Sequence, residues 1–157
     1  VIRPAPEMTI PVSVVFVCTG NMCRSPFAEH VFRDLGPKSV DACSAGIAAV
    51  PGGAATPMSI SAARRFGVYL SRHRARPLEE QILRRASGIY VFEHRHRTNI
   101  ERQFPDLRSK IHLVGTFVGA PDGEIPDPLG PSEDRVVRCY EIIERACRAL
   151  SERLQQP

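Results

Sequence analysis

The sequence predicts an α/β protein, a three-layer α/β/α sandwich built around a central four-stranded parallel sheet. Short apolar runs alternate along the chain with segments of helical periodicity, and this alternation is typical of a parallel sheet. The first run, VVFV at residues 14–17, contains no polar residue, as expected for a strand that helices cover on both faces. A length of 157 residues is enough for one domain with its own core.

The pattern divides the chain into an N-terminal tail or linker, 1–11, and a single domain, 12–157. Strands are expected at 14–17, 39–44, 88–92 and 110–115. Helices are expected at 25–36, 59–67, 77–86, 96–104 and about 132–154. Ser25 is the predicted N-cap of the first helix, with Pro26 at its first position and Gly36 at its end. The stretch 119–134 is dense in Pro, Gly and Asp and is expected to be a loop.

Composition excludes several classes of protein. Hydrophobic residues make up 43% and charged residues 24%, as in ordinary globular proteins, and no apolar stretch reaches the length of a membrane span. No signal peptide is visible, so we expect a cytoplasmic protein that does not bind membranes. The five cysteines are an odd number and lack zinc-finger spacing, which argues against a disulfide scaffold and a zinc site. We interpret His94 and His96 as the start of a polar helix, and we expect no metal and no cofactor.

The net charge is +4, and only two of the 21 basic residues are lysines. The arginines are scattered among 17 acidic residues, aromatic residues are few and Trp is absent. Stacking platforms for nucleic acid are therefore not expected, and we predict no nucleic-acid partner. A solvated basic surface is the preferred interpretation, and a preference for anionic protein substrates is the alternative.

A cysteine followed six residues later by an arginine occurs three times, at Cys18/Arg24, Cys139/Arg145 and Cys147/Arg153. Such a short pattern has a high chance frequency. The last two pairs lie inside the C-terminal helical pattern, where the backbone amides are already bonded. Only the first pair lies between a strand and a helix.

The loop between Cys18 and Arg24 has the features of a phosphate site. Gly20 is expected to allow the backbone to turn its N–H groups inward, and the helix N-terminus adds unpaired amides and the positive end of its dipole. Arg24 can make a two-pronged contact with phosphate oxygens. The same field is expected to favour the thiolate form of Cys18 at neutral pH, poised for in-line attack on phosphorus.

The departing atom also needs a proton, which a carboxylic acid can supply. Asp127, between Pro126 and Pro128, is the candidate. A simple turn role for Asp127 is an equal alternative, since Asp-Pro pairs often form turns. Asp122, Glu124 and Asp134 are rivals in the same loop.

Together these segments resemble the low-molecular-weight protein tyrosine phosphatases, from about Val12 to the C-terminus. The resemblance rests on VCTGNMCRSPFAEHVF around Cys18, SAGIAAVPGGAATP after the second strand, FGVYLSRHRARPL, and IPDPLG at the acid loop. The four segments occur in the family's order. The resemblance implies the phosphatase I-like fold and a metal-independent phosphomonoester hydrolase.

The resemblance also implies residue roles. Cys18 would be the nucleophile that forms a phosphocysteine, Arg24 would bind the phosphoryl group, and Asp127 would be the general acid and then the base. The phosphate-binding loop would comprise Thr19, Gly20, Asn21, Met22, Cys23 and Ser25. Ser25 would hydrogen-bond the thiolate, Asn21, Ser44 and His73 would brace the loop, and Cys23 would trap oxidised Cys18. The alternatives are a helix cap for Ser25 and core packing for His73 and Cys23; Cys43, Cys139 and Cys147 are assigned to the core.

The substrate mouth is expected at Met22, Val50 and Leu129. Many family members carry aromatic residues at the last two places, so the walls around a phosphotyrosine ring are reduced. The stretches around Val50 and Leu129 resemble the subgroup that includes protein-arginine phosphatases, but that subgroup has threonine where Met22 stands. We therefore expect phosphotyrosine hydrolysis by a monomer acting on phosphorylated proteins. The alternatives are a protein-arginine phosphatase and a phosphate-binding module without catalysis; arsenate reductases need two further mid-chain cysteines that are absent between Cys43 and Cys139.

Overall fold

The computed structural model describes residues 12–128 and 130–156, and the predicted tail, 1–11, lies outside the described residues. Four strands form one sheet in the order β2-β1-β3-β4, and every neighbouring pair is parallel. The strands are β1 (Val12–Cys18), β2 (Val40–Gly46), β3 (Gly88–Val91) and β4 (Ile111–Leu113). The predicted parallel sheet is therefore confirmed.

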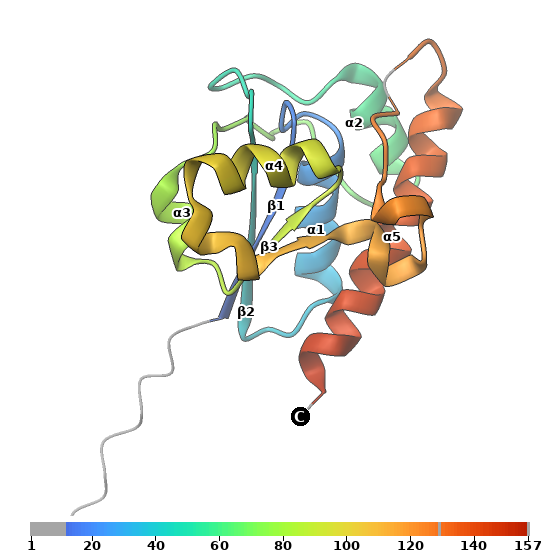
Figure 1. Cartoon of the computed structure of the whole chain (residues 1–157). Helices are drawn as coiled ribbons and strands as arrows, with labels where there is room; N and C mark the ends of the chain where they lie inside the picture. The colour runs from blue at the N-terminus through green and yellow to red at the C-terminus, as the bar shows by residue number, and fades with distance from the viewer. Residues whose placement is uncertain (1–11, 129, 157) are drawn as a thin grey trace, which may run out of the picture.

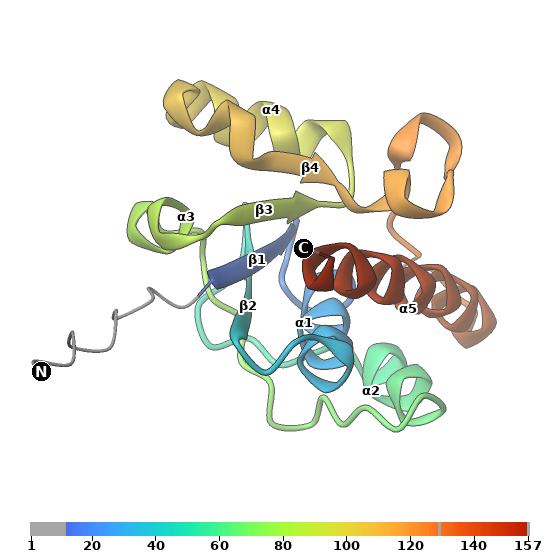
Figure 2. The ribbon, with the colours of Figure 1, turned by 90° about the horizontal axis from the view of Figure 1, so that it is seen from below.

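Helices cover both faces of the sheet, which gives the expected three layers (Figures 1 and 2). The helices are α1 (Arg24–Leu35), α2 (Pro57–Arg64), α3 (Glu80–Arg85), α4 (His94–Gln103) and α5 (Glu133–Gln155). Helices α1 and α5 lie together on one face, with α2 packed against α5, while α3 and α4 lie on the other (Figure 2).

Strand β1 shows why its apolar run is unbroken. Successive side chains of a strand point to opposite faces of the sheet. Val14 and Phe16 belong to the core beneath α1 and α5, whereas Val15 and Val17 belong to the core beneath α3 and α4. All four are at most 1% exposed, so both faces of β1 require apolar residues.

The C-terminal helix α5 is anchored on α1 by an aromatic pair. The Tyr140 and Phe27 rings are stacked with their centroids 3.8 Å apart and their planes at 2°. Both side chains are fully buried. This contact brings α5, more than 100 residues away in sequence, behind the loop that follows β1.

Several boundaries differ from the prediction. The segment expected to be helical at 77–86 is helical only over α3, because Pro77 pairs with Gly46 at the end of β2 and Leu78 N–H donates to the Gly46 carbonyl. Strand β4 is three residues long and lies between two 3₁₀ helices, η1 (Pro105–Lys110) and η2 (Val114–Val118). The Pro-rich loop contains a third, η3 (Pro121–Gly123).

Within the two described stretches of the chain, no helix combines the length and apolar character that a membrane crossing requires.

Candidate active site

The loop after β1 forms one wall of a small cavity at the carboxyl end of the sheet. The cavity has a volume of about 240 Å³. Its lining residues are Cys18, Thr19, Gly20, Met22, Cys23, Arg24, Ala48 and Asp127. The fold therefore brings the predicted nucleophile, the predicted phosphate-binding arginine and the predicted acid to one place, although Asp127 is more than 100 residues from Cys18 in sequence.

The turn of this loop is made by Asn21, and the prediction that Gly20 supplies the unusual backbone conformation is wrong. Asn21 has a φ of 54°, in the left-handed region, and Gly20 is not among the residues with positive φ. Asparagine tolerates this region better than most residues, and its side chain can be fixed by local hydrogen bonds. Asn21 is fully buried.

The Asn21 side chain connects the loop to β2 and α1. Its amide Nδ2 donates to Ser25 Oγ at 2.8 Å and to Ser44 Oγ at 2.9 Å. Ser44 in turn donates to Glu29 Oε1 at 2.9 Å. Both amide hydrogens of Asn21 are thus used, and every member of this buried chain of polar groups has a partner, as buried polar groups require.

Ser25 faces Cys18 and does not cap α1. Helix α1 begins at Arg24, with Cys23 at the N-cap position, so the prediction of Ser25 as the cap is wrong. Ser25 Oγ lies 2.9 Å from Cys18 Sγ. Since Ser25 Oγ accepts a hydrogen bond from Asn21, its own hydroxyl hydrogen can be donated to a Cys18 thiolate.

Two further groups hold the Asn21 position from the segment before α3. His73 Nε2 lies 2.7 Å from the Asn21 carbonyl oxygen. The backbone N–H of Arg76 donates to Asn21 Oδ1 at 3.0 Å. The structure thus places Ser44 and His73, two of the three residues expected to brace the loop, in contact with the third, Asn21.

Arg24 lies beneath the cavity with its side chain only 2% exposed. Its Nη1 donates to Glu93 Oε2 at 2.7 Å and to the Ile125 carbonyl at 2.9 Å. Both hydrogen bonds that Arg24 makes within the described residues use Nη1, which leaves Nε and Nη2 for the two-pronged contact that suits a phosphate.

Glu93 and His96, at the start of α4, belong to the site although the sequence analysis missed them. His96 is fully buried, and its Nε2 lies 2.9 Å from Thr19 Oγ1. The prediction that His96 lies at the start of a polar helix is confirmed, since His96 is in the first turn of α4. Its contact with Thr19 was not predicted. In the sequence, the one indication of this contact is that His96 closely follows β3. The indication is useful only when the strand order is known, because β3 lies next to β1 in the sheet.

The environment of these two residues fixes their charge. Burial alone would raise the pKa of Glu93, but hydrogen bonds from Arg95 and Arg24 hold it below its ordinary value. Burial lowers the pKa of His96 to about 4, with a further contribution from the charge of Arg24. At neutral pH, Glu93 is therefore a carboxylate and His96 a neutral imidazole.

Asp127 is exposed and lines the same cavity as the residues of the β1 loop. Its rivals have other positions. Glu124 accepts a hydrogen bond from the His94 backbone N–H, Asp134 pairs with Arg65, and none of Asp122, Glu124 and Asp134 is among the lining residues.

The mouth differs in part from the expectation. Met22 lines the cavity, as expected, but Val50 is 70% exposed and is not among the lining residues. Ala48, two residues earlier, takes that place because its backbone N–H is bonded to the Thr19 carbonyl at 2.9 Å. Leu129 lies outside the described residues.

Cys23 also lines the cavity. Burial raises the pKa of the Cys23 thiol, and hydrogen bonds from Ser59 and Tyr140 offset this only in part. The Tyr140 hydroxyl also donates to the Cys23 carbonyl at 2.9 Å. Cys139 and Cys147 lie in the core beneath α1 and α5, and Cys43 packs against the other core.

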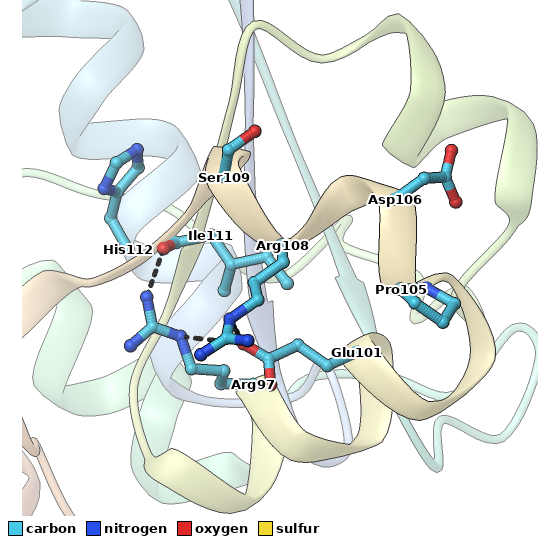
Figure 3. Close-up of a pocket in the computed structure, with 8 residues that line it drawn as sticks. All are labelled: Arg97, Glu101, Pro105, Asp106, Arg108, Ser109, Ile111 and His112. Atoms are coloured by element: carbon cyan, nitrogen blue, oxygen red, sulfur yellow. Dashed lines mark hydrogen bonds and ion pairs between the residues drawn. The ribbon is translucent and has the colours of Figure 1, made fainter.

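A larger cavity of about 750 Å³ lies elsewhere, between α4, η1 and β4. Its arginines are paired: Arg97 and Arg108 both contact Glu101, and Arg97 also donates to the Ile111 carbonyl (Figure 3). No cysteine lines it. Size alone therefore does not identify the site.

Among residues 12–128 and 130–156, no group of three His, Cys, Asp or Glu side chains could hold a metal ion.

Comparison with known proteins agrees with this geometry. The model of the family described as low molecular weight phosphotyrosine protein phosphatase matches residues 13–157. The chain belongs to this family. The match begins one residue into β1 and continues through every later element of the fold.

Relatives of this family member include enzymes with different substrates. The chain is 33% identical to the protein-arginine-phosphatase of Bacillus subtilis, covering 91% of this chain and 97% of the relative. It is 34% identical to the low molecular weight protein-tyrosine-phosphatase Wzb of Salmonella typhi, covering 90% and 93%. A crystal structure of a YwlE mutant from Bacillus subtilis has a TM-score of 0.85 at 32% identity, covering 92% and 99%. The crystal structure of the tyrosine phosphatase Wzb from Escherichia coli K30 in complex with sulphate has a TM-score of 0.83 at 32% identity. The match covers 90% of this chain and 97% of that one.

Proposed function

We propose that this chain is a metal-independent protein phosphatase that hydrolyses phosphotyrosine through a phosphocysteine intermediate. The observation that carries the proposal is the shared cavity of Cys18, Arg24 and Asp127. A mutant of the YwlE arginine phosphatase with a phosphorylated active-site serine supports a covalent intermediate in this family.

In the first step, the Cys18 thiolate attacks phosphorus in line with the ester bond. The S–P bond forms as the bond to the tyrosine oxygen breaks, and Asp127 gives its proton to the departing oxygen. Arg24 and the loop amides hold the three equatorial oxygens as charge redistributes in the transition state. The Ser25 hydroxyl stabilises the thiolate before attack.

In the second step, Asp127, now a carboxylate, removes a proton from water that attacks the phosphocysteine. The S–P bond breaks, the thiolate returns and inorganic phosphate leaves. The carboxyl that gave one proton thus takes one back, and the enzyme is restored.

A single substitution tests this mechanism. Cys18→Ser should reduce turnover of an aryl phosphate to background, because the hydroxyl is a far poorer nucleophile, while inorganic phosphate still binds. Wild-type turnover should be unchanged by a chelator. Appreciable activity of Cys18→Ser, or inhibition by the chelator, would contradict the mechanism, and absence of wild-type turnover would favour the binding module without catalysis.

The choice of phosphotyrosine rests on Met22, which lines the cavity. A flexible thioether side chain packs well against an aromatic ring, whereas a departing guanidinium would be better served by a hydroxyl or carboxylate. The second candidate is a protein-arginine phosphatase, favoured by the 33% identity to the Bacillus subtilis enzyme. Asp127 could protonate oxygen or nitrogen alike, so it does not discriminate.

Parallel assays with phosphotyrosine and phosphoarginine decide between the two. We expect faster turnover of phosphotyrosine with weak discrimination, since Ala48 and the exposed Val50 leave the walls of the mouth low. Met22→Thr should raise the ratio of phosphoarginine to phosphotyrosine turnover, by about tenfold if one hydrogen bond to the charged guanidinium is gained. A wild-type protein that hydrolyses phosphoarginine far faster would move the assignment to the arginine phosphatases.

We further propose that the protein is a cytoplasmic monomer whose partners are phosphorylated proteins, without nucleic-acid or membrane binding. The five cysteines are free thiols, which suits a reducing compartment. Within the described residues, the exposed large apolar side chains come from four separate segments: Val12, Val50, Tyr69 and Leu154. Light scattering of the purified protein tests the monomer.

A further inference from the structure

The contact between His96 and Thr19 joins the first turn of α4 to the loop that carries Cys18. The two residues are 77 positions apart, and the Nε2–Oγ1 distance is 2.9 Å. His96 is fully buried, whereas Thr19 lines the cavity with Cys18, Arg24 and Asp127. One end of this hydrogen bond is therefore in the protein interior and the other at the place where substrate binds.

The tautomer of His96 follows from its second partner. Its Nδ1 accepts a hydrogen bond from the Glu93 backbone N–H at 3.1 Å, as part of the capping box of α4. A neutral imidazole whose Nδ1 is an acceptor carries its hydrogen on Nε2. Glu93 Oε2 is also near Nε2, at 3.5 Å, but Thr19 Oγ1 is the closer acceptor.

The donor from His96 leaves Thr19 with a hydroxyl hydrogen to give. A hydroxyl has one hydrogen and two lone pairs. With one lone pair occupied by His96 on the buried side, the hydroxyl hydrogen points to another acceptor, and Thr19 faces the cavity. The arrangement repeats that of Ser25, whose Oγ accepts from Asn21 while its hydroxyl hydrogen can go to Cys18.

We propose that His96 is a positioning residue that directs the Thr19 hydroxyl at a phosphoryl oxygen of the bound substrate, and that Thr19 is a phosphate-binding side chain. The inference rests on the proposed function, because it adds one donor to the same site. Thr19 would then bind phosphate through its side-chain hydroxyl, in addition to the backbone N–H that any residue of such a loop can offer.

Two variants of His96 separate this role from helix capping. In His96→Asn, the amide oxygen can occupy the place of Nδ1 and keep the cap, but no group reaches Thr19. In His96→Gln, the longer side chain can bring its Nε2 donor to Thr19. We expect His96→Asn to lower kcat/KM for an aryl phosphate about tenfold and to weaken inorganic phosphate binding by a similar factor, as for one lost hydrogen bond to a charged group. His96→Gln should recover most of both.

Thr19→Val should show the same loss, Thr19→Ser should restore it, and Thr19→Val combined with His96→Asn should lose no more than the greater single effect. The matched control is His112→Asn on β4: His112 does not line the cavity of Cys18, so this variant should match wild type. Melting temperatures of all variants separate lost stability from lost positioning.

Wild-type phosphate affinity and kcat/KM in Thr19→Val would overturn the proposal, even if both His96 variants were inactive. So would full activity of His96→Asn together with loss in His96→Gln, since capping would then be the role of His96. Titration with inorganic phosphate needs no turnover, so it tests the hydroxyl even if the proposed hydrolysis fails, whereas absence of wild-type turnover would count against the proposed function alone.

Discussion

At the scale of single residues, the buried polar side chains around Asn21 are the most informative feature. Asn21 takes a left-handed conformation that most residues avoid, and its two amide hydrogens and its oxygen all have partners. These hydrogen bonds stabilise the strained turn at Asn21 and so hold the loop in the conformation in which its residues line the cavity. The loop is therefore preorganised before any phosphate binds.

The pair of cysteines in the loop leads to a prediction about oxidation. Peroxide should convert Cys18 to a sulfenic acid, which can condense with the Cys23 thiol to a disulfide and release water. Cys18 and Cys23 both line the cavity. Because burial raises the pKa of Cys23, its side chain is a thiol at neutral pH. We expect reversible inactivation by mild peroxide, with recovery by a thiol reductant.

In Cys23→Ser, recovery should be mostly lost, because Cys18 then proceeds to irreversible oxidation states. Activity after peroxide and after reductant is the measurement, and mass spectrometry identifies the disulfide. Equal recovery in wild type and variant would remove the protective role from Cys23.

At the scale of elements, the end of β2 fixes the loop as much as the loop's own residues do. Ile47 N–H donates to the Cys18 carbonyl at 3.0 Å and Ala48 N–H to the Thr19 carbonyl at 2.9 Å. Gly46 lies against the loop backbone: a Cβ there would be 2.6 Å from the Thr19 carbonyl oxygen and 2.9 Å from the Asn21 nitrogen. Only glycine allows β2 to approach the loop so closely.

Gly46→Ala should therefore push the loop out of position. Because both clashing atoms are backbone, relief requires movement of the loop itself, and we expect kcat/KM to fall about 10²-fold. Gly67→Ala is the matched control: Gly67 has a φ of +72° and an open surrounding, so this change should destabilise the fold without altering kcat/KM. Unchanged activity in folded Gly46→Ala would show that the loop tolerates the added methyl group.

At the scale of the whole molecule, the buried neutral histidine makes stability depend on pH. Burial lowers the pKa of His96 to about 4, and burial also lowers the pKa values of His30 and His112. A histidine in the unfolded chain titrates near about 6.5. Between these values the unfolded chain binds more protons than the folded chain, so the free energy of unfolding falls as the pH is lowered.

The contribution of His96 to the free energy of unfolding is fully present above about pH 6.5. As the pH falls toward the folded-state pKa of His96, at most about 3 kcal/mol of this free energy is lost. Urea unfolding at pH 7.5, 6, 5 and 4.5 is the measurement. The decline should be shallower in His96→Gln, which has no imidazole to protonate. Parallel declines in both proteins would show that other groups dominate.

The fold class, the strand–loop–helix context of Cys18 and the burial of β1 on both faces could all be predicted from the sequence. These features are local: the apolar run of β1, the helical periodicity of α1 and α5, and the position of Gly36 act over a few residues each. The family's loop could be recognised for the same reason, since its donors come from one continuous segment, 18–25.

The distant residues that complete the site could not be predicted in this way, because they come together only in the folded chain. Glu93 and His96 follow β3, and they reach Arg24 and Thr19 because β3 pairs with β1 rather than β2. Asp127 joins the cavity, whereas Asp122 and Glu124 in the same loop do not, and Ala48 replaces Val50 at the mouth. Strand order and loop path depend on how two cores and five helices pack around one sheet. No local pattern of residues encodes that packing, because its contacts join segments tens of residues apart.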